Sequence, residues 1–337
     1  MATTTIFTDI DYEATGKQVD NLNLPYSPHD DAWGVIPFPI AIIRGNELGP
    51  TVFLNAAVHG DEYEGPIVLN EMIRELNPED IAGRLIFLPC ANAPALRAAN
   101  RCSPVDGRNL ARVFPGDPWG TPTQQIAAYI HDVIFPLSDY YIDLHAGGSS
   151  LFIEQCAQVI LTPTMTREVR EKSEKLATWF GAKWTVLTTN MGDPRTSCGS
   201  AVNAGIPCIA AEMGVNGSVS PEGVRDTRAA VRRVLSHLGV LRNVEAETPP
   251  KTRYVEVISK NGNLISPSNG FFEPFVALGD AVKAGQPAGR LHLLDEPMRE
   301  PETIYFKTDG LIYSLRTFGI VKTGNSLAVL ARDTQLS

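Results

Sequence analysis

Residues 51–66 read T-V-F-L-N-A-A-V-H-G-D-E-Y-E-G-P, and this stretch predicts both the fold class and the chemistry. The run Thr51–Leu54 is typical of a buried strand, and an amphipathic run begins at Ile67. His59 and Glu62 therefore lie on a predicted strand-to-helix turn, where α/β folds place functional side chains. Zinc accepts both an imidazole and a carboxylate as ligands. Taken alone, H-x-x-E is weak evidence for a metal site, because a surface turn with a capping glutamate is the more common explanation.

Strands and helices alternate outward from this stretch. The predicted strands are 35–44, 51–57, 84–90, 140–144 and 206–211, and the predicted helices are 67–76, 124–135, 164–180 and 221–238. This alternation is typical of an α/β fold with a parallel or mixed sheet and helices on both faces. Residues 1–33 are expected to form an irregular arm, and residues 46–50 a turn.

The composition changes at the run E-T-P-P-K-T that begins at Glu247, which is typical of a linker. Beyond this run the pattern is all β. We therefore predict a catalytic domain at 1–246 and a C-terminal β domain at 247–337.

The β domain contains a weak internal sequence repeat. G-F-F at 270–272 and G-L-I at 310–312 open two similar halves. Paired hairpins of this kind predict a small barrel-sandwich-like domain, similar to lipoyl and biotinyl carrier domains. The carrier lysine between two methionines is missing, since K-T-D stands near that point at 307–309. We expect a structural or substrate-gating appendage instead.

Composition excludes several classes of function. The net charge of -9 disfavours a nucleic-acid partner, which would need a basic face. No run of about 18 apolar residues is present, so no membrane span is expected. Five widely spaced cysteines without C-x-x-C are typical of reduced thiols, and the polar first 16 residues lack a signal-peptide pattern. We expect a cytoplasmic protein, with a homo-oligomer as the base-rate expectation.

Two further strand ends carry reactive side chains. His145 ends Y-I-D-L-H and is followed by Ala146-Gly147-Gly148, and Glu212 ends I-A-A-E before Met213-Gly214. Asp143 lies on the same face of its strand as His145 and could orient an imidazole. Each residue alone also fits an ordinary strand-end or capping role.

The loop 101–116 carries arginines at 101, 108 and 112. Guanidinium groups pair with carboxylates in a bidentate geometry, so such a cluster suits a carboxylate substrate. Solvated loop arginines are the equal alternative from these residues alone.

Taken together, four blocks resemble the succinylglutamate desuccinylase/aspartoacylase family of zinc deacylases. They are H-G-D-E at 59–62, R-N-L-A-R-V-F-P-G at 108–116, D-L-H at 143–145 and E-M-G at 212–214. The resemblance covers about residues 30–335, and it is specific because the blocks occur jointly in the family's order and spacing. It implies a zinc-carboxypeptidase-like mixed sheet flanked by helices, followed by the β domain.

Within that family, the N-terminal blocks are most similar to those of N-α-acetyl-diaminobutyrate deacetylases. These blocks are K-Q-V at 17–19, L-P-Y-S at 24–27 and D-D-A-W-G at 30–34. The resemblance implies an amidohydrolase that removes a short acyl group from an N-acyl amino acid, with N-acetyl-diaminobutyrate as the candidate substrate.

The resemblance also implies roles for single residues. One Zn²⁺ per chain would be held by His59, Glu62 and His145, with water in the open fourth position. Glu212 matches the family's general base, and Arg101 matches the arginine that polarises the scissile carbonyl. Three protein ligands plus water is also the usual arrangement of catalytic zinc.

The substrate carboxylate would be held by Arg112, with Asn109 and Arg108 beside it. The family usually has asparagine at the position of Ala111, so this chain departs from the pattern there. A buried hydrogen bond to a charged group contributes roughly 1.5–3 kcal/mol, so the change affects the expected substrate more than the expected chemistry.

Two other readings remain open at this stage. A metallocarboxypeptidase acting on small peptides would use the same zinc ligands, although the β domain would crowd a peptide cleft. A catalytically relaxed zinc-binding relative would explain Ala111, but such a protein has no need of Glu212 as a base.

Overall fold

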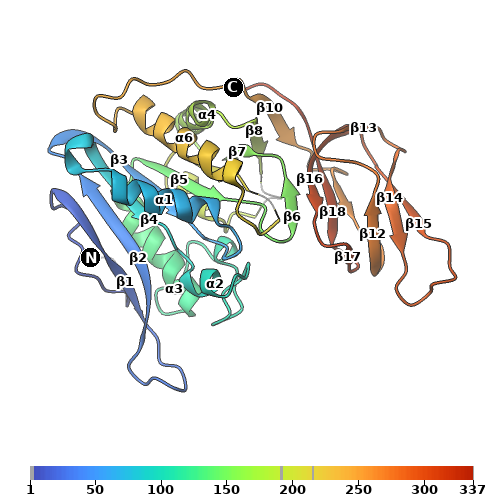
Figure 1. The fold of residues 1–337 in the computed structure, drawn as a ribbon, viewed down its shortest axis with the longest axis horizontal. Helices are drawn as coiled ribbons and strands as arrows, with labels where there is room; N and C mark the ends of the chain where they lie inside the picture. Colours follow the sequence, from blue (N-terminus) through green and yellow to red (C-terminus); the bar gives the residue numbers. More distant parts are fainter. Residues whose placement is uncertain (1–3, 190–192, 215, 337) are drawn as a thin grey trace.

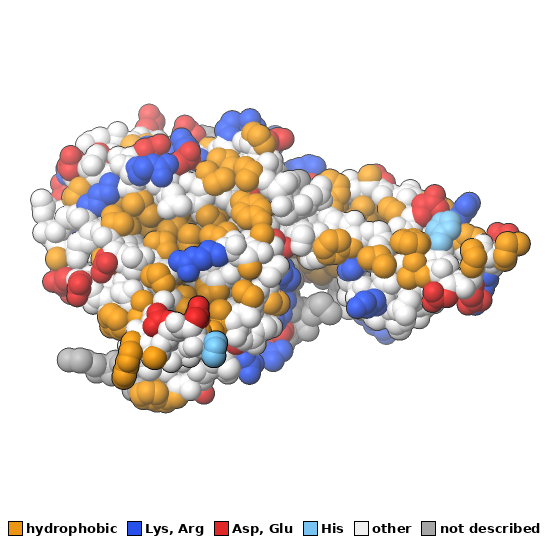
Figure 2. Space-filling model, turned by 60° about the horizontal axis from the view of Figure 1, so that its bottom comes forward, with side chains coloured by type: hydrophobic (Ala, Val, Ile, Leu, Met, Phe, Trp, Pro, Cys, Tyr) orange, Lys and Arg blue, Asp and Glu red, His pale blue; other side chains and the backbone are white. Residues whose placement is uncertain are grey.

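The structure is a computed structural model that describes residues 4–189, 193–214 and 216–336. The outermost residues of the two predicted domains, 1–3 and 337, lie outside these ranges. An α/β body carries a narrower lobe of C-terminal strands (Figures 1 and 2). None of the helices in the described ranges is long and apolar enough to cross a bilayer.

The chain forms these elements in order. The strands are β1 Gly16–Pro25, β2 Val35–Arg44, β3 Glu47–Ala56, β4 Ala82–Leu88, β5 Tyr140–His145, β6 Leu151–Ile153, β7 Cys156–Ile160, β8 Trp184–Thr188, β9 Cys208–Glu212, β10 Arg253–Val257, β11 Asn263–Ile265, β12 Gly270–Pro274, β13 Ala281–Val282, β14 Pro287–His292, β15 Glu302–Tyr305, β16 Gly310–Arg316, β17 Ile320–Val321 and β18 Ser326–Asp333. The α-helices are α1 Glu64–Glu75, α2 Ala93–Arg97, α3 Pro122–Tyr129, α4 Arg167–Phe180, α5 Ser197–Asn203 and α6 Pro221–His237.

One large mixed sheet organises the body. Its order is β1-β2-β4-β3-β5-β9-β7-β8-β10-β18-β16-β13. The neighbours β4, β3, β5 and β9 are parallel, so their carboxyl ends meet at one edge of the sheet. That edge is where the sequence places its candidate ligands and base.

The sheet is covered on both faces, as the near-continuous apolar strands predict. Side chains alternate along β3, so Phe53 joins one core cluster while Val52 and Leu54 join the other. Helices α3 and α5 pack on the Phe53 face, where Phe53 stacks on Tyr141 with ring centroids 4.9 Å apart. Helices α1, α4 and α6 pack on the opposite face. This two-sided core holds the strand ends rigidly.

The expectation of an irregular arm over residues 1–33 is wrong, because β1 pairs with β2 over its whole length. Three of the ten residues of β1 are Asn or Asp and Gly begins the strand, so local propensity gave no strand signal. The expected turn at 46–50 is also wrong, since β3 already begins at Glu47. The expected helix 124–135 exists, but it changes to a π-helix at Ile130 and ends in a 3₁₀ turn.

The C-terminal strands are continuous with the body. After the run 247–252, β10 pairs in parallel with β8 and antiparallel with β18. A second, antiparallel sheet has the order β15-β14-β12-β17, and its side chains share a separate core with β16 and β18. Strand β16 also pairs with β6, which follows shortly after His145 (Figure 1). The C-terminal strands therefore reach toward the candidate site.

A candidate metal centre at the strand ends

Three parallel strands bring the predicted residues together. Glu212 at the end of β9 lies directly opposite His145 at the end of β5. The chain leaves the neighbouring strand β3 at Ala56 and turns through Ala57, whose φ is 54°. A positive φ at alanine is costly, and such backbone positions cluster at functional sites. The turn delivers His59 to the same edge of the sheet.

His59, Glu62 and His145 form a compact cluster. One ligand atom from each lies within 4.8 Å of the other two, and all three side chains are at most 9% exposed. His59 Nδ1 lies 2.7 Å from Glu62 Oε1, and His145 Nδ1 lies 2.9 Å from Glu62 Oε2. Both imidazoles therefore turn the same nitrogen, Nδ1, toward one carboxylate.

The outer nitrogen of each imidazole has its own partner. His145 Nε2 lies 3.0 Å from Asp143 Oδ2, and His59 Nε2 lies 3.1 Å from Asn109 Oδ1. A metal-binding histidine characteristically donates a hydrogen bond from the ring nitrogen that does not face the metal. This hydrogen bond fixes the tautomer and the orientation of the ring. The donor set of two Nδ1 atoms and one carboxylate therefore fits zinc.

Asp143 is itself held in a buried network. Its Oδ2 accepts a hydrogen bond from Ser197 Oγ, and its Oδ1 accepts one from Asn55 Nδ2 at 3.0 Å. Asn55 Nδ2 also lies 3.1 Å from the Tyr141 hydroxyl. These contacts orient the carboxylate that orients His145.

The electrostatics of the metal-free cluster follow from burial and from mutual charge. Burial disfavours the imidazolium of His145, but the carboxylates of Asp143 and Glu62 outweigh it and raise the pKa of His145 well above its usual value. Burial lowers the pKa of His59. Burial also opposes ionisation of Glu62, yet the two imidazoles hold the pKa of that carboxyl below its usual range. In the metal-free protein these charges therefore favour the protonated form of His145.

Zinc binding is therefore expected to release protons and to tighten as the pH rises. The raised pKa of His145 favours its protonated form in the metal-free protein, and the imidazole must lose that proton to ligate. Each proton released raises the apparent affinity up to about tenfold per pH unit between pH 6 and 8. Titration calorimetry in buffers of different ionisation enthalpy measures the proton count. An affinity that is flat over this range would contradict the assignment of His145 as a ligand.

The acids on either side of Glu62 hold the loops that carry the other site residues. Asp61 Oδ2 accepts from both the backbone N and the hydroxyl of Ser149, at 2.7 Å each, in the turn after His145. Glu64 Oε1 accepts from Ser220 N at 2.8 Å, just before α6. The H-G-D-E-Y-E run therefore positions two distant loops as well as supplying ligands.

Gly60 allows the ligand-bearing turn to approach α2. A Cβ on this residue would lie 2.0 Å from the backbone carbon and oxygen of Ala95. We expect Gly60→Ala to destabilise the fold by about 1–3 kcal/mol and to displace His59. Urea unfolding and zinc affinity measure the two effects. Gly319→Ala is the matched control, because no atom lies within 4 Å of that Cβ. Equal zinc affinity for both variants would refute the tight approach.

Glu212 stands beside the cluster in an unusual setting. Burial, followed by the negative charge of Glu62, raises the pKa of Glu212 to about 8. Its Oε1 accepts a hydrogen bond from Gln158 Nε2 at 3.4 Å, whereas its buried Oε2 has no hydrogen-bond partner in the described parts of the chain. A carboxylate with a free oxygen and raised basicity suits proton transfer.

The four predicted residues of the arginine loop separate into two groups. Arg101 Nη1 lies 3.6 Å from Glu62 Oε1 and is partly exposed, so it borders the cluster. Arg112 Nε lies 3.4 Å from Asp193 Oδ2, and burial followed by the charge of Arg101 lowers the pKa of Arg112. Arg101 therefore lies against the cluster, whereas Arg112 is paired with Asp193.

Arg108 and Asn109 are placed differently. Arg108 is exposed, and its side chain makes no hydrogen bond or ion pair to any described residue. Asn109 Oδ1 is engaged twice, by His59 Nε2 at 3.1 Å and by Ala111 N at 2.9 Å. The structure thus brings Asn109 to a metal-ligand candidate, and Ala111 is buried.

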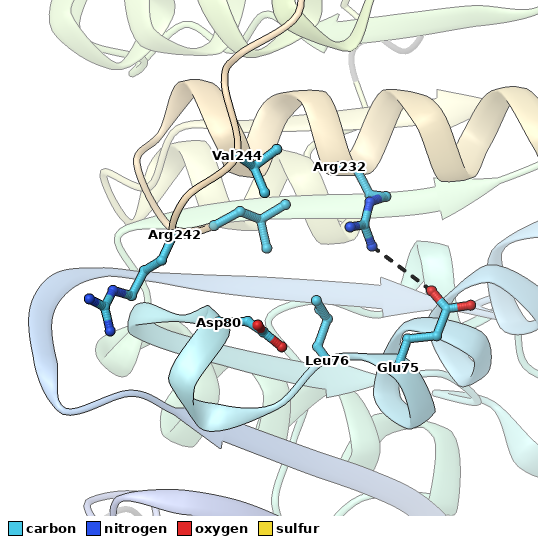
Figure 3. A pocket seen from close by; sticks show the side chains of 7 residues that line it. Glu75, Leu76, Asp80, Arg232, Arg242 and Val244 are labelled. Carbon is cyan, nitrogen blue, oxygen red and sulfur yellow. Dashed lines mark ion pairs between the residues drawn. The ribbon is translucent and has the colours of Figure 1, made fainter.

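A cavity of about 190 Å³ lies elsewhere, at the opposite edge of the sheet (Figure 3). It is bounded by the last residues of α1, the 3₁₀ turn that follows and the chain after α6. Its charges are Glu75, Asp80, Arg232 and Arg242, with Arg232 3.9 Å from Glu75. Arg242 is paired with Glu47 at 2.6 Å. No candidate site residue lines it, and its mixed charges indicate no particular ligand.

Sequence reasoning missed the residues that support the site. Ser197, Asn55, Gln158 and Tyr313 carry no local motif. Asp61 had a signal, since it stands between two candidate ligands in the H-G-D-E block. The remaining partners are identified only by the three-dimensional fold.

Comparison with known proteins identifies relatives of this chain. The sequence-family model of the succinylglutamate desuccinylase/aspartoacylase catalytic domain matches residues 48–238 of this chain. An N-alpha-acetyl-L-2,4-diaminobutyric acid deacetylase from Halomonas elongata is 33% identical over 96% of this chain and 93% of its own.

Two solved structures are similar over almost the whole chain. A succinylglutamate desuccinylase/aspartoacylase from Rhodobacter sphaeroides has a TM-score of 0.91 and 33% identity, covering 98% of this chain and 100% of its own. The product-bound ectoine utilization protein EutE (DoeB) from Ruegeria pomeroyi has a TM-score of 0.91 and 31% identity, covering 97% and 98%. This chain belongs to the succinylglutamate desuccinylase/aspartoacylase family, whose members include deacylases and deacetylases.

Proposed function

We propose that this protein is a zinc-dependent amidohydrolase that cleaves the amide bond of an N-acyl amino acid. The observation that carries the proposal is the convergence of His59 Nδ1 and His145 Nδ1 on the carboxylate of Glu62, with Glu212 opposite His145. Two imidazoles, a ligand carboxylate and a second free carboxylate are the parts that metal-assisted hydrolysis requires.

Zinc, when bound, supplies a Lewis acid that lowers the pKa of water to about 7 and polarises a carbonyl. Glu212 takes a proton from the attacking water at its free Oε2 and later donates it to the leaving amine. The guanidinium of Arg101, beside Glu62, stabilises the negative charge that develops on the carbonyl oxygen.

The substrate is expected to carry a carboxylate. Arg112 is the residue assigned to it, with exposed Arg108 at the outer rim. Asn109 is less available than its place in the loop indicated, because its amide oxygen is already bound to His59. The candidate substrate is N-acetyl-diaminobutyrate, since the Halomonas elongata relative is named for that activity. Its ammonium group also suits an acidic protein of net charge -9.

We further propose a cytoplasmic location and a homo-oligomeric state, both on general grounds. The division into domains at 246/247 and the closure of the C-terminal strands into a barrel-sandwich also remain proposals. The pairing of β16 with β6 supports a role for these strands beside the site rather than as a separate carrier module.

A hydrolysis screen tests the function. Purified protein, zinc-loaded or treated with chelator, would be incubated with N-acetyl-diaminobutyrate, N-acetyl-aspartate, N-succinyl-glutamate and a series of dipeptides. We expect zinc-dependent release of acetate from the first compound and little cleavage of dipeptides. Cleavage of dipeptides alone would identify a carboxypeptidase. No turnover of any compound by protein with one zinc per chain would reject the deacylase proposal.

A further inference from the structure

Glu212 is held from outside the metal cluster by a chain of two polar side chains. Gln158 lies on β7, which runs antiparallel beside β9, and its Nε2 donates to Glu212 Oε1 at 3.4 Å. The same amide nitrogen donates to the hydroxyl of Tyr313 at 2.7 Å. Both hydrogens of one side-chain amide are thereby used, one on each neighbour.

Tyr313 comes from β16, within the C-terminal strands. Its side chain is 6% exposed and stacks on Trp184, with ring centroids 6.4 Å apart. Its backbone oxygen accepts from Glu154 N at 3.1 Å, and its hydroxyl lies 3.6 Å from Cys156 Sγ. The ring contact, the backbone hydrogen bond and the hydroxyl contact together position the Tyr313 hydroxyl as an acceptor for Gln158.

We propose that Gln158 and Tyr313 are positioning residues for the general base, an inference that rests on the proposed function. Holding Oε1 of Glu212 leaves Oε2, which has no partner among the described residues, as the oxygen that receives the proton. The C-terminal strands thereby contribute to catalysis without touching the substrate, because Tyr313 fixes Gln158 and Gln158 fixes Glu212.

A purely structural role would be the simpler explanation, since a buried tyrosine hydroxyl needs a hydrogen-bond partner in any case. The two roles differ in what they change. A structural role lowers the unfolding temperature and leaves kcat per folded molecule intact. A positioning role lowers kcat and leaves KM, zinc content and folding nearly intact.

The test uses Tyr313→Phe, Gln158→Met and the double variant in the full zinc-loaded chain. We expect kcat to fall by about 10- to 100-fold in each single variant, with KM changed less than about twofold. The double variant should match Gln158→Met alone, because the tyrosine acts only through the glutamine. Tyr305→Phe is the control, since Tyr305 is an exposed tyrosine of the same C-terminal region. Unchanged kcat in both single variants, or fully additive losses, would overturn the proposal.

Crystal structures of the zinc-loaded proteins give a readout that does not need turnover. We expect Gln158 Nε2 within about 3.5 Å of Glu212 Oε1 in the unaltered protein and a displaced Glu212 carboxylate in Gln158→Met. An identical Glu212 conformation in the two structures would refute the positioning role even if the unaltered protein hydrolyses no tested amide. Absence of turnover in the unaltered protein with the expected displacement would refute only the proposed function.

Discussion

Glu212→Gln is expected to lower kcat by about 10³-fold while one zinc ion remains bound per chain. General acid–base groups contribute roughly 10²- to 10⁴-fold to rate, and the amide of glutamine cannot accept the proton. The side chain keeps its size, and its Oε1 can still accept from Gln158. The three candidate ligands are untouched, so zinc affinity should stay within a few-fold of the original.

Steady-state kinetics and metal analysis of the same preparation measure this result. Glu302→Gln is the control, because Glu302 is exposed on β15, far along the chain from the cluster. If Glu212→Gln kept most of the activity, another residue would have to move the proton. If it lost zinc as well, Glu212 would belong to the ligand set instead.

His145→Ala is expected to weaken zinc binding by on the order of 10²- to 10³-fold and to abolish turnover. Zinc sites with four protein ligands bind with roughly 10–16 kcal/mol, so one ligand accounts for about 2.5–4 kcal/mol, and each 1.4 kcal/mol is a factor of ten. Competition with a chromophoric chelator measures the affinity. His29→Ala is the control, because His29 is exposed in the loop between β1 and β2.

Asp143→Asn separates ligation from orientation in the same assay. Loss of an outer partner of a ligating imidazole weakens metal binding by about 10- to 100-fold, less than loss of the ligand itself. Asparagine has nearly the same size as aspartate, and its side-chain oxygen can still accept the hydrogen bond from Asn55. It lacks the negative charge that lies 3.0 Å from His145 Nε2. Equal losses for Asp143→Asn and His145→Ala would mean that Asp143 itself binds the metal.

The sequence predicted the centre of the fold because that part depends on local patterns. Residues 51–57 form a short apolar run ending in a turn, and residues 67–76 repeat apolar side chains at helical spacing. The strand expected at 35–44 has the observed bounds of β2. The four motif blocks then named the family, which the comparisons confirm.

The edge strand β1 and the hydrogen-bond partners of the site residues could not be predicted from the sequence alone. Polar β1 is a strand only because β2 supplies a full ladder of partners. Gln158 and Tyr313 meet across 155 positions of sequence, so no spacing rule links them. The hydrogen bond between Asn109 Oδ1 and His59 Nε2 joins residues 50 positions apart, so it depends on how the loop folds. Tertiary contacts decide these features, and local propensity does not encode them.

The binding of zinc by His59, Glu62 and His145 is tested most directly by anomalous diffraction at the zinc edge from crystals of the zinc-loaded protein. We predict one strong peak per chain, with both Nδ1 atoms and an oxygen of Glu62 at about 2.0–2.2 Å from it. A peak at any other group of side chains, or ligation through Nε2 of either histidine, would contradict the account.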